Sequence, residues 1–350
     1  MIDLPAENNT VGIIGTGSHI PSNEVPNHVI AAWTGVSEEW IVRKTGIHTR
    51  WYAAEHEATS DLAVRAAEAA LAAARIDPGD LGWIVVATST PDYPQPATAC
   101  LVQHQIGATQ AAAFDVNSVC SGFVVALVTA AALLSGAADH TPRHALVIGA
   151  DTFSRIIDRS DRKTAVFFGD AAGAVVLGPV PPGKGLLGAH LASYGEHHAM
   201  IRVEAGGSRV PASEKSLAAG QHSFRMDGRG VWEFVEAELP GVVRKLLAKH
   251  GIDAAAVNHI IPHQANAVLL HELLPRLALP RARMLVTVGE HGNTSAASIP
   301  LALDTAQRKG LFEDGELLLL AGFGGGMSIA TALVTWAGTR ADSRKEVSAT

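Results

Sequence analysis

The sequence has very little cysteine, with Cys100 and Cys120 as its only two among 350 residues. A domain that depends on a disulfide framework uses a larger set of cysteines at regular spacings. The first ten residues, Met1 to Thr10, are polar and acidic and lack the basic and apolar regions of a secretory signal. We therefore expect the chain to work in the reducing environment of the cytoplasm.

Long runs of one charge are also missing. The net charge is −7, and no basic stretch resembles the footprint of a nucleic-acid-binding protein. The 16 histidines show no ligand spacing, and His197-His198 has no matching cysteine or carboxylate cluster, so no metal site is predicted. The longest apolar run, residues 123–134, is too short and too rich in alanine for a membrane span. It predicts a helix that is buried on all sides.

What the chain does have is a globular composition with alternating strand and helix signals. Apolar residues make up 47% and charged residues 17%. Short β-branched runs alternate with alanine-rich helical segments, which is typical of α/β architecture with buried sheets. The predicted strands are residues 11–15, 83–87, 112–116, 144–149 and 165–178, and residues 59–74 form a helix with Thr59 or Ser60 as its N-cap.

The second half of the chain repeats this plan. A predicted helix at residues 231–249 leads through Ile-Asp to a strand at 257–261, as the helix at 59–74 leads to the strand at 83–87, and a further strand is expected at 284–288. We therefore predict a duplicated fold with an N-terminal half at residues 1–180 and a C-terminal half at 181–350, joined at Pro181-Pro-Gly-Lys-Gly185. The polar segment from Gly206 to His222 is expected to be a surface loop, either beside a binding site or a plain insertion.

Cys120 is the first candidate for chemistry, because it lies between a predicted strand and a predicted helix. The N–H groups and the dipole of a helix N-terminus stabilise a thiolate, the nucleophilic form of cysteine. A nucleophile for acyl transfer is one interpretation, and a buried structural cysteine is the other.

His263 and Asn293 follow predicted strands of the second half, where the carboxyl ends of strands gather ligands. Alone, each has a structural explanation, as a core histidine or a helix cap. Together with Cys120 they suit a condensation: the thiolate holds an acyl group, and the His and Asn side chains donate hydrogen bonds to an enolate oxygen. Backbone N–H groups of Cys120 and Gly325 are candidates for a second oxyanion hole, because the run Gly324-Gly-Gly326 allows close approach.

At this point the chain resembles the β-ketoacyl-acyl-carrier-protein synthase III family, the ketosynthases III of the thiolase superfamily. The resemblance runs from Gly15 to Trp336. Its motifs, in order, are Glu39-Trp-Ile-Val-Arg-Lys-Thr-Gly-Ile47, the Cys120 segment, Asp161-Arg-Lys-Thr164, Phe168-Gly-Asp-Ala-Ala-Gly-Ala174, Pro262-His-Gln-Ala-Asn266, Gly292-Asn-Thr-Ser-Ala296 and Gly322-Phe-Gly-Gly-Gly326.

The resemblance implies a five-layer αβαβα fold, a homodimer and no cofactor beyond coenzyme A thioesters as substrates. It implies that an acyl group from coenzyme A is loaded on Cys120, and that His263 and Asn293 support decarboxylation of a malonyl unit carried by acyl carrier protein or coenzyme A. No nucleic acid or membrane partner is expected. The positions that would bind coenzyme A are Trp40, Lys44, Arg162, Arg229 and Asn266, and those that would gate the acyl pocket are Tyr93 and Phe323.

Three positions depart from the usual pattern of that family. Val268 replaces an arginine two residues after Asn266, Lys44 replaces an arginine before Thr45 and loses the guanidinium fork, and Met327-Ser-Ile-Ala330 replaces a segment with Thr-Trp-Gly. These differences favour a specialised relative, such as a starter-unit enzyme of polyketide or other secondary metabolism.

Three functions remain open from the sequence. The first is a decarboxylating condensing enzyme. The second is an acyltransferase on the same fold that passes the acyl group from Cys120 to a hydroxyl or amine. The third is a non-catalytic partner subunit, which the presence of Cys120 disfavours. The sequence does not identify the acyl chain or the carrier of the malonyl unit.

Overall fold

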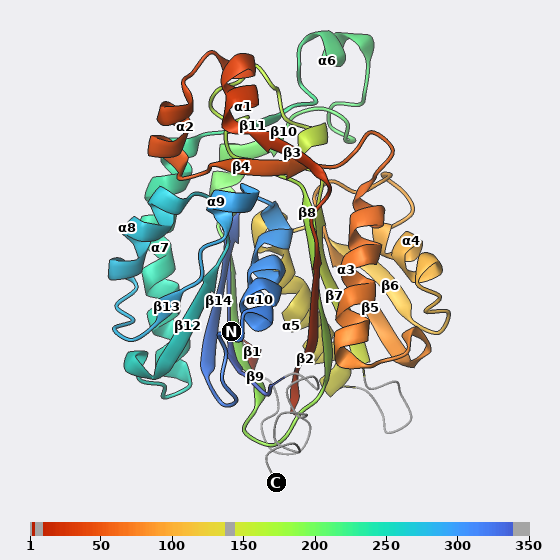
Figure 1. The fold of residues 1–350 in the computed structure, drawn as a ribbon, viewed down its shortest axis with the longest axis vertical. Coiled ribbons are helices and arrows are strands. Elements are labelled where there is room, and N and C mark those ends of the chain that lie inside the picture. Colours follow the sequence, from red (N-terminus) through yellow and green to blue (C-terminus); the bar gives the residue numbers. More distant parts are fainter. Residues whose placement is uncertain (1, 4–9, 137–143, 339–350) are drawn as a thin grey trace.

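A computed structural model describes residues 2–3, 10–136 and 144–338 and contains two large sheets (Figure 1). The first sheet has the strand order β2-β8-β7-β5-β6. Its strands are β2 (Val11–His19), β5 (Leu81–Ala87), β6 (Ala112–Val116), β7 (His144–Asp151) and β8 (Ala171–Pro179). The second has the order β1-β9-β15-β14-β12-β13. Its strands are β1 (Ile2–Asp3), β9 (Gly185–Ser193), β12 (Val257–Pro262), β13 (Arg283–Met284), β14 (Leu317–Gly324) and β15 (Ser328–Thr335).

The two sheets repeat one topology. In the first, β8 pairs antiparallel with β2 and β7, while β5 pairs parallel with β7 and β6. In the second, β15 pairs antiparallel with β9 and β14, while β12 pairs parallel with β14 and β13. Five strands of each sheet therefore correspond one to one. The added strand, β1, comes from the start of the chain and pairs with β9 at the edge of the second sheet.

Helices form the remaining three layers (Figure 1). Between the sheets lie α5 (Gly122–Ser135) and α10 (Ser298–Arg308). The outer helices of the first half are α3 (Thr59–Ala74) and α4 (Thr98–Gln105), and those of the second half are α7 (Gly228–Lys249) and α8 (Ala267–Arg276). The predicted duplicated five-layer αβαβα fold is thus confirmed.

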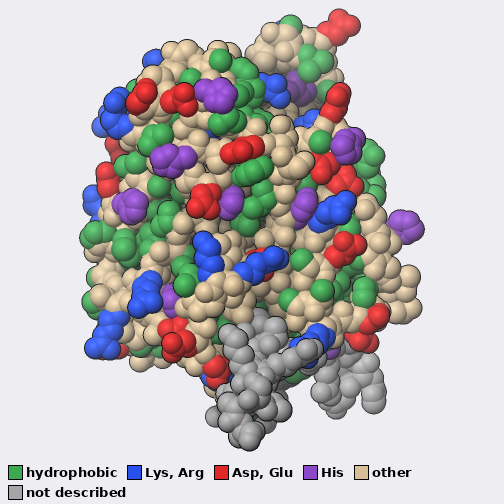
Figure 2. Space-filling model, viewed as in Figure 1, with side chains coloured by type: hydrophobic (Ala, Val, Ile, Leu, Met, Phe, Trp, Pro, Cys, Tyr) green, Lys and Arg blue, Asp and Glu red, His purple; other side chains and the backbone are tan. Residues whose placement is uncertain are grey.

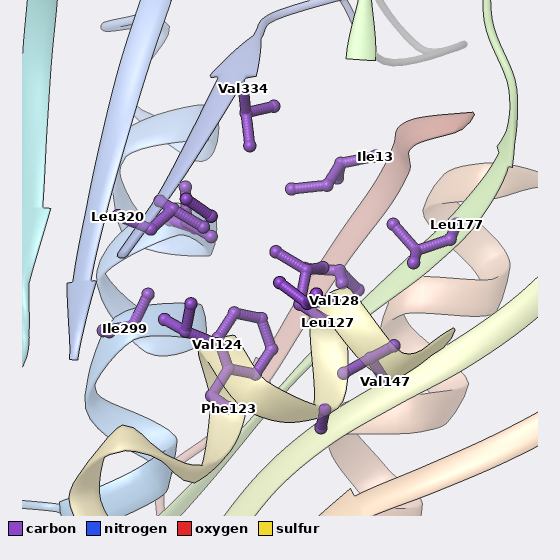
Figure 3. Packing of buried hydrophobic residues seen from close by; sticks show 14 of the residues in the cluster. Ile13, Phe123, Val124, Leu127, Val128, Val147, Leu177, Ile299, Leu320 and Val334 are labelled. Carbon is purple, nitrogen blue, oxygen red and sulfur yellow. The ribbon is translucent and has the colours of Figure 1, made fainter. Parts of the chain in front are cut away.

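The core between the two sheets explains the long apolar run in the sequence. Phe123, Val124 and Leu127 of α5 are almost completely buried. Their side chains meet Ile13 and Val147 of the first sheet, as well as residues of α10 and the second sheet (Figure 3). Because α5 is covered on both sides, it has no polar face, as the sequence predicted.

Smaller elements cover the end of the molecule at which the catalytic candidates lie (Figure 1). They are the strand pair β3 (Asn23–Pro26) and β4 (Thr49–Tyr52), the helices α1 (Asn27–Thr34) and α2 (Glu38–Thr45), the strand pair β10 (Ile201–Val203) and β11 (Phe224–Met226), and the short helices α6 (Glu214–Ala218) and α9 (Val288–His291).

The structure corrects several predicted elements. Residues 165–167 form a turn and Phe168 makes an isolated bridge to Asn293, so the strand expected at 165–178 begins only at Ala171. The strand expected at 284–288 is limited to β13, and α9 follows it. The loop from Gly206 to His222 contains α6. Helix α3 has the predicted bounds, but its N-cap is Ala58, which has an extended backbone. The Thr59 hydroxyl donates to the Thr90 carbonyl (2.6 Å) instead of capping the helix.

The surface carries charges of both signs, with Lys and Arg interspersed among Asp and Glu on the face shown in Figure 2. Within the described ranges, no helix combines the length and apolarity needed to cross a membrane. The same part of the chain holds no cluster of three or more His, Cys, Asp or Glu side chains arranged for a metal ion.

Candidate active site

Cys120 lies in a 3₁₀ turn, Val119–Ser121, between β6 and α5. The turn is sharp, because Val119 has a φ of 46°, in the left-handed region that β-branched residues rarely adopt. The end of β14 packs directly on the cysteine: a Cβ atom at Gly324 would come within 2.8 Å of the Cys120 Cβ. Only glycine fits there, so the glycine run brings the second sheet against the candidate nucleophile.

The protonation state of Cys120 differs from the prediction. The thiol is 7% exposed, and burial raises its pKa to about 12, with the negative charge of Asp151 acting in the same direction. A hydrogen bond with Ser295 lowers the pKa, but less strongly. Helix-terminal stabilisation therefore does not produce a thiolate at rest, because removal from water disfavours the charged form more.

His263 follows β12 directly, and its backbone N–H donates to the Ala321 carbonyl (2.8 Å). Nδ1 of the ring is 2.8 Å from the Ser298 hydroxyl, and the ring packs edge-on against Phe323 at 5.2 Å between centroids. Burial lowers the pKa of His263 to about 3, although the backbone of Ser295 opposes this shift. The imidazole is therefore neutral at physiological pH, and it can donate a hydrogen bond without carrying charge.

Asn293 is fixed by the backbone on both sides. Its N–H donates to the Phe167 carbonyl (2.8 Å), and its own carbonyl accepts from the Gly169 N–H (3.0 Å). The side-chain Oδ1 accepts from the Ser295 N–H (2.9 Å). Because the carbonyl end of the amide is used in this way, the NH₂ end is the part available to donate to a substrate oxygen.

The structure brings the three predicted residues together around one turn, the 3₁₀ segment Ser295–Ala297. The Ser295 hydroxyl lies 3.5 Å from the Cys120 sulfur, and the Ser295 N–H donates to Asn293 Oδ1. The backbone of Ser295 also hydrogen-bonds the His263 ring. The sequence analysis did not single out Ser295. The signal that it matters is its left-handed backbone, φ 51°, which matches Val119 beside Cys120 in the first half.

The candidates for the backbone oxyanion hole also lie near Cys120. A Cβ at Gly325 would contact Val119 and Ile201 at 3.2 Å, whereas Gly324 is the glycine that faces Cys120 itself. The assignment of the Gly325 N–H to this role stays a prediction.

Two of the residues predicted to bind coenzyme A touch each other. Asn266 Nδ2 donates to the Lys44 carbonyl (3.2 Å), which joins α8 to α2. Asn266 Oδ1 caps α8 by accepting from the N–H groups of Val268 (2.8 Å) and Leu269 (3.3 Å). The capping role thus exists independently of any contact with substrate.

The other predicted binding residues are distributed over the covering elements. Trp40 is half-buried on α2, and Arg162 is exposed in the turn that precedes β8. Arg229 is exposed on the first turn of α7 and pairs with Glu233 (2.8 Å). A cation–π contact in this region joins Arg159 to the Trp33 ring at 4.7 Å. The contact of Trp40 and Arg162 with an adenine ring remains a prediction.

The two predicted gate residues have different environments. Phe323 is buried in β14 against His263, so it lines the site itself. Tyr93 is 57% exposed in the segment between β5 and α4. The role of Tyr93 as a gate of the acyl pocket stays a prediction.

Known proteins share these features. Residues 114–195 match the family model described as 3-oxoacyl-[acyl-carrier-protein (ACP)] synthase III, and residues 247–336 match its C-terminal counterpart. The chain is 52% identical over 326 residues to the acetoacetyl CoA synthase NphT7 of Streptomyces sp. (strain CL190), covering 93% of this chain and 98% of that protein. The chain belongs to the β-ketoacyl-ACP synthase III family.

Other members of the family agree with this assignment. The β-ketoacyl-[acyl-carrier-protein] synthase III of Caldanaerobacter subterraneus subsp. tengcongensis is 40% identical, covering 93% of this chain and 97% of that protein. The crystal structure of the priming β-ketosynthase of the R1128 polyketide pathway superposes with a TM-score of 0.86 at 30% identity, covering 95% of this chain and 98% of that one. The family and fold predicted from the sequence are confirmed, and the chain is a condensing enzyme of the transferase class.

Proposed function

We propose that the enzyme loads an acyl group from coenzyme A on Cys120 and condenses it with malonyl-CoA to give a β-ketoacyl-CoA. The observation that carries this proposal is the convergence of Cys120, His263 and Asn293 on the Ser295 turn. A nucleophile and two neutral donors are the groups that such a condensation requires.

In the loading step, the Cys120 sulfur attacks the thioester carbon of the acyl-CoA. The acyl–sulfur bond to coenzyme A breaks, and the proton lost by Cys120 ends on the released coenzyme A thiol. Backbone N–H groups at Cys120 and Gly325 are the proposed donors to the oxyanion of this step, next to the close contact between Gly324 and Cys120.

In the condensing step, the malonyl carboxylate leaves as CO₂ and its bonding electrons form an enolate. The neutral His263 imidazole and the Asn293 amide donate hydrogen bonds to the enolate oxygen, where they stabilise the developing charge in a buried site. The enolate carbon attacks the acyl-cysteine, the carbon–sulfur bond to Cys120 breaks, and the departing thiolate takes up a proton from water. Loss of CO₂ supplies the carbanion, so the step draws on these side chains and on no added base.

The choice of malonyl-CoA rather than malonyl-ACP has two supports. The 52% identical relative is named an acetoacetyl CoA synthase. In this chain Val268 stands on the first turn of α8, beside Asn266, at a place where a basic residue would attract an acidic carrier protein. The likeness to the priming ketosynthase of a polyketide pathway further supports a place in secondary metabolism.

A homodimer is part of the proposal. Strand β6 forms the open edge of the first sheet, and its residues are exposed or half-buried rather than buried as in the neighbouring strands. Unpaired edges favour pairing with another strand, and Tyr93, on the chain segment after the neighbouring strand β5, exposes a large ring.

We place the enzyme in the cytoplasm, where its free cysteines would stay reduced.

The test uses intact-protein mass spectrometry on the full chain and on the Cys120→Ala variant after incubation with a panel of acyl-CoAs. A mass gain that Cys120→Ala lacks, and that malonyl-CoA discharges with release of CO₂, supports the proposal. Discharge by malonyl-ACP alone would overturn the choice of carrier. Discharge only by an alcohol or amine would favour the acyltransferase, and absence of any mass gain would leave the nucleophile assignment wrong.

A further inference from the structure

Ser295 is the residue that touches all three catalytic candidates, yet its own side chain has no assigned role. Its hydroxyl is completely buried and lies 3.5 Å from Cys120 Sγ. Its backbone N–H, by contrast, serves Asn293 (2.9 Å). The side chain and the backbone of Ser295 therefore contact different catalytic groups.

Behind Ser295 lies Asp151, at the end of β7 and completely buried. Its Oδ1 accepts from the Ser89 N–H (2.8 Å), the Thr90 hydroxyl (2.9 Å), the Ser89 hydroxyl (3.1 Å) and the Thr88 hydroxyl (3.2 Å). Its Oδ2 accepts from the Ala296 N–H (3.1 Å), and the carboxylate also interacts with the Ser295 side chain by hydrogen bonding. Asp151 thus ties the Ser295 turn of the second half to the first sheet.

We propose that Ser295 is a positioning residue for the nucleophile: its hydroxyl, which donates to the Asp151 carboxylate in the resting enzyme, turns to donate to the Cys120 sulfur as the thiolate forms, while the bond from the Ala296 N–H to Asp151 holds the turn in place. The inference deepens the proposed function, since it concerns the same nucleophile. Burial raises the pKa of the Cys120 thiol to about 12, and the Ser295 hydrogen bond opposes that rise. A donor to the thiolate is what a desolvated thiol requires in order to react near neutral pH.

The charged and titratable groups around Cys120 are few. Asp151 faces the thiol from β7 and raises its pKa through its negative charge. His263 approaches from the end of β12 and is neutral, because burial lowers its pKa to about 3. Ser295 is therefore the side chain that favours the thiolate, while Asp151 disfavours it and His263 adds no charge.

The experiment compares the full-length enzyme with Ser295→Ala. Alanine keeps the backbone N–H and carbonyl, so the contacts with Asn293 and His263 remain. The hydroxyl is lost together with its contacts to Cys120 and Asp151. The pH dependence of alkylation by iodoacetamide is followed at Cys120 by peptide mass spectrometry, with the partly exposed Cys100 as an internal reference thiol. In the same preparations, CO₂ release from malonyl-CoA without an acyl starter reports on His263 and Asn293.

We expect alkylation of Cys120 to fall roughly tenfold to a hundredfold at pH 8 in Ser295→Ala, the loss of one hydrogen bond to a charged sulfur. Alkylation of Cys100 and CO₂ release should stay near the wild-type rates. In Ser298→Ala, by contrast, CO₂ release should fall while alkylation of Cys120 stays near the wild-type rate, because Ser298 contacts His263 (2.8 Å).

Two results would overturn the inference. One is Cys120 alkylation in Ser295→Ala at the wild-type rate relative to Cys100. The other is a parallel fall in alkylation, CO₂ release and thermal stability, which would mean that Ser295 only supports the fold. Alkylation needs no thioester, so the inference can hold even where the proposed condensation fails.

Discussion

The hydroxyl of Ser295 lies 3.5 Å from the sulfur of Cys120, although 175 positions separate the two residues in the sequence. Cys120 begins the helix between the sheets that belongs to the first half, and Ser295 begins the corresponding helix of the second half. Both turns contain a residue in the left-handed region, Val119 and Ser295. The duplicated architecture therefore places the nucleophile where its two halves meet.

Replacement of Cys120 by alanine should abolish acylation of the enzyme and the overall condensation, because no other group near His263 and Asn293 is a thiol. Cys100→Ala is the matched control. Its sulfur makes only a weak contact with the Ala113 carbonyl (3.8 Å), so this variant should keep both reactions. Loss of acylation in the control instead would show that the wrong cysteine has been assigned.

Replacement of Asn293 by alanine should lower CO₂ release by about 100-fold to 1,000-fold, the usual effect of removing one donor from an oxyanion hole. Acylation of Cys120 should continue, since the Asn293 side chain serves the enolate. Rapid-quench measurement of both half-reactions in one preparation separates these effects. Equal loss of both would contradict the division of roles.

Replacement of Gly324 by alanine should inactivate the enzyme, because the new Cβ would lie 2.8 Å from the Cys120 Cβ and 2.9 Å from its backbone nitrogen. Gly195→Ala is the control, since its Cβ would meet no atom within 4 Å. The thermal unfolding temperature and the acylation rate should both fall in Gly324→Ala and stay near wild type in Gly195→Ala. An active Gly324→Ala enzyme would show that the turn at Cys120 yields easily.

Several of these features follow from the sequence. Helix α3 was predicted with its bounds, Thr59–Ala74, because alanine-rich helical periodicity is a local property. Strand β6 was likewise predicted at Ala112–Val116. The proximity of Cys120, His263 and Asn293 could be predicted because residues that follow strands in this topology gather at one edge, and their catalytic roles stay a prediction.

The features that the sequence did not yield depend on contacts across the two halves. The left-handed backbone of Ser295 is imposed by packing against η2 (Val119–Ser121) and β7, so it leaves no mark on composition or periodicity. The thiolate expected at Cys120 was wrong for the same reason, because burial by Gly324 and its neighbours outweighs the helix terminus. Residues 284–288 have strand propensity, but of these only Met284 pairs with a neighbouring strand, as part of the short β13 beside β12.

Acid should destabilise the enzyme through His263, and the sign follows from its pKa. The unfolded histidine binds a proton below about 6.5, whereas the folded one does so only near pH 3. Stability from this group is complete above pH 6.5 and is lost as the pH falls, by about 1.4 kcal/mol per pH unit for one proton. Chemical denaturation of His263→Gln should show a shallower fall between pH 6 and pH 4. An identical slope in both proteins would contradict the buried, neutral imidazole.

Replacement of Val268 by arginine should raise activity with malonyl-ACP relative to malonyl-CoA. The new guanidinium would stand on the first turn of α8, next to Asn266, and would attract the acidic carrier at low ionic strength. His271→Arg adds an equal charge at an exposed position of the same helix and serves as the control. The ratio of kcat/KM for the two extenders measures the effect. An unchanged ratio in Val268→Arg would mean that this position does not select the carrier.

The division of the site between the two sheets has a further consequence. Cys120 lies beyond the carboxyl end of β6 in the first sheet, and His263 follows β12 in the second. The contacts that join the two halves here include the buried Ser295 hydroxyl, the buried Asp151 carboxylate and the backbone hydrogen bonds of Asn293 to the segment before β8. A slight sliding of one layer over the other would separate the acylated sulfur from the enolate while both sheets kept their hydrogen bonds. The rate of condensation should therefore respond to a shift between the two sheets earlier than any measure of secondary structure does. On heating, condensation activity should be lost before the protein unfolds.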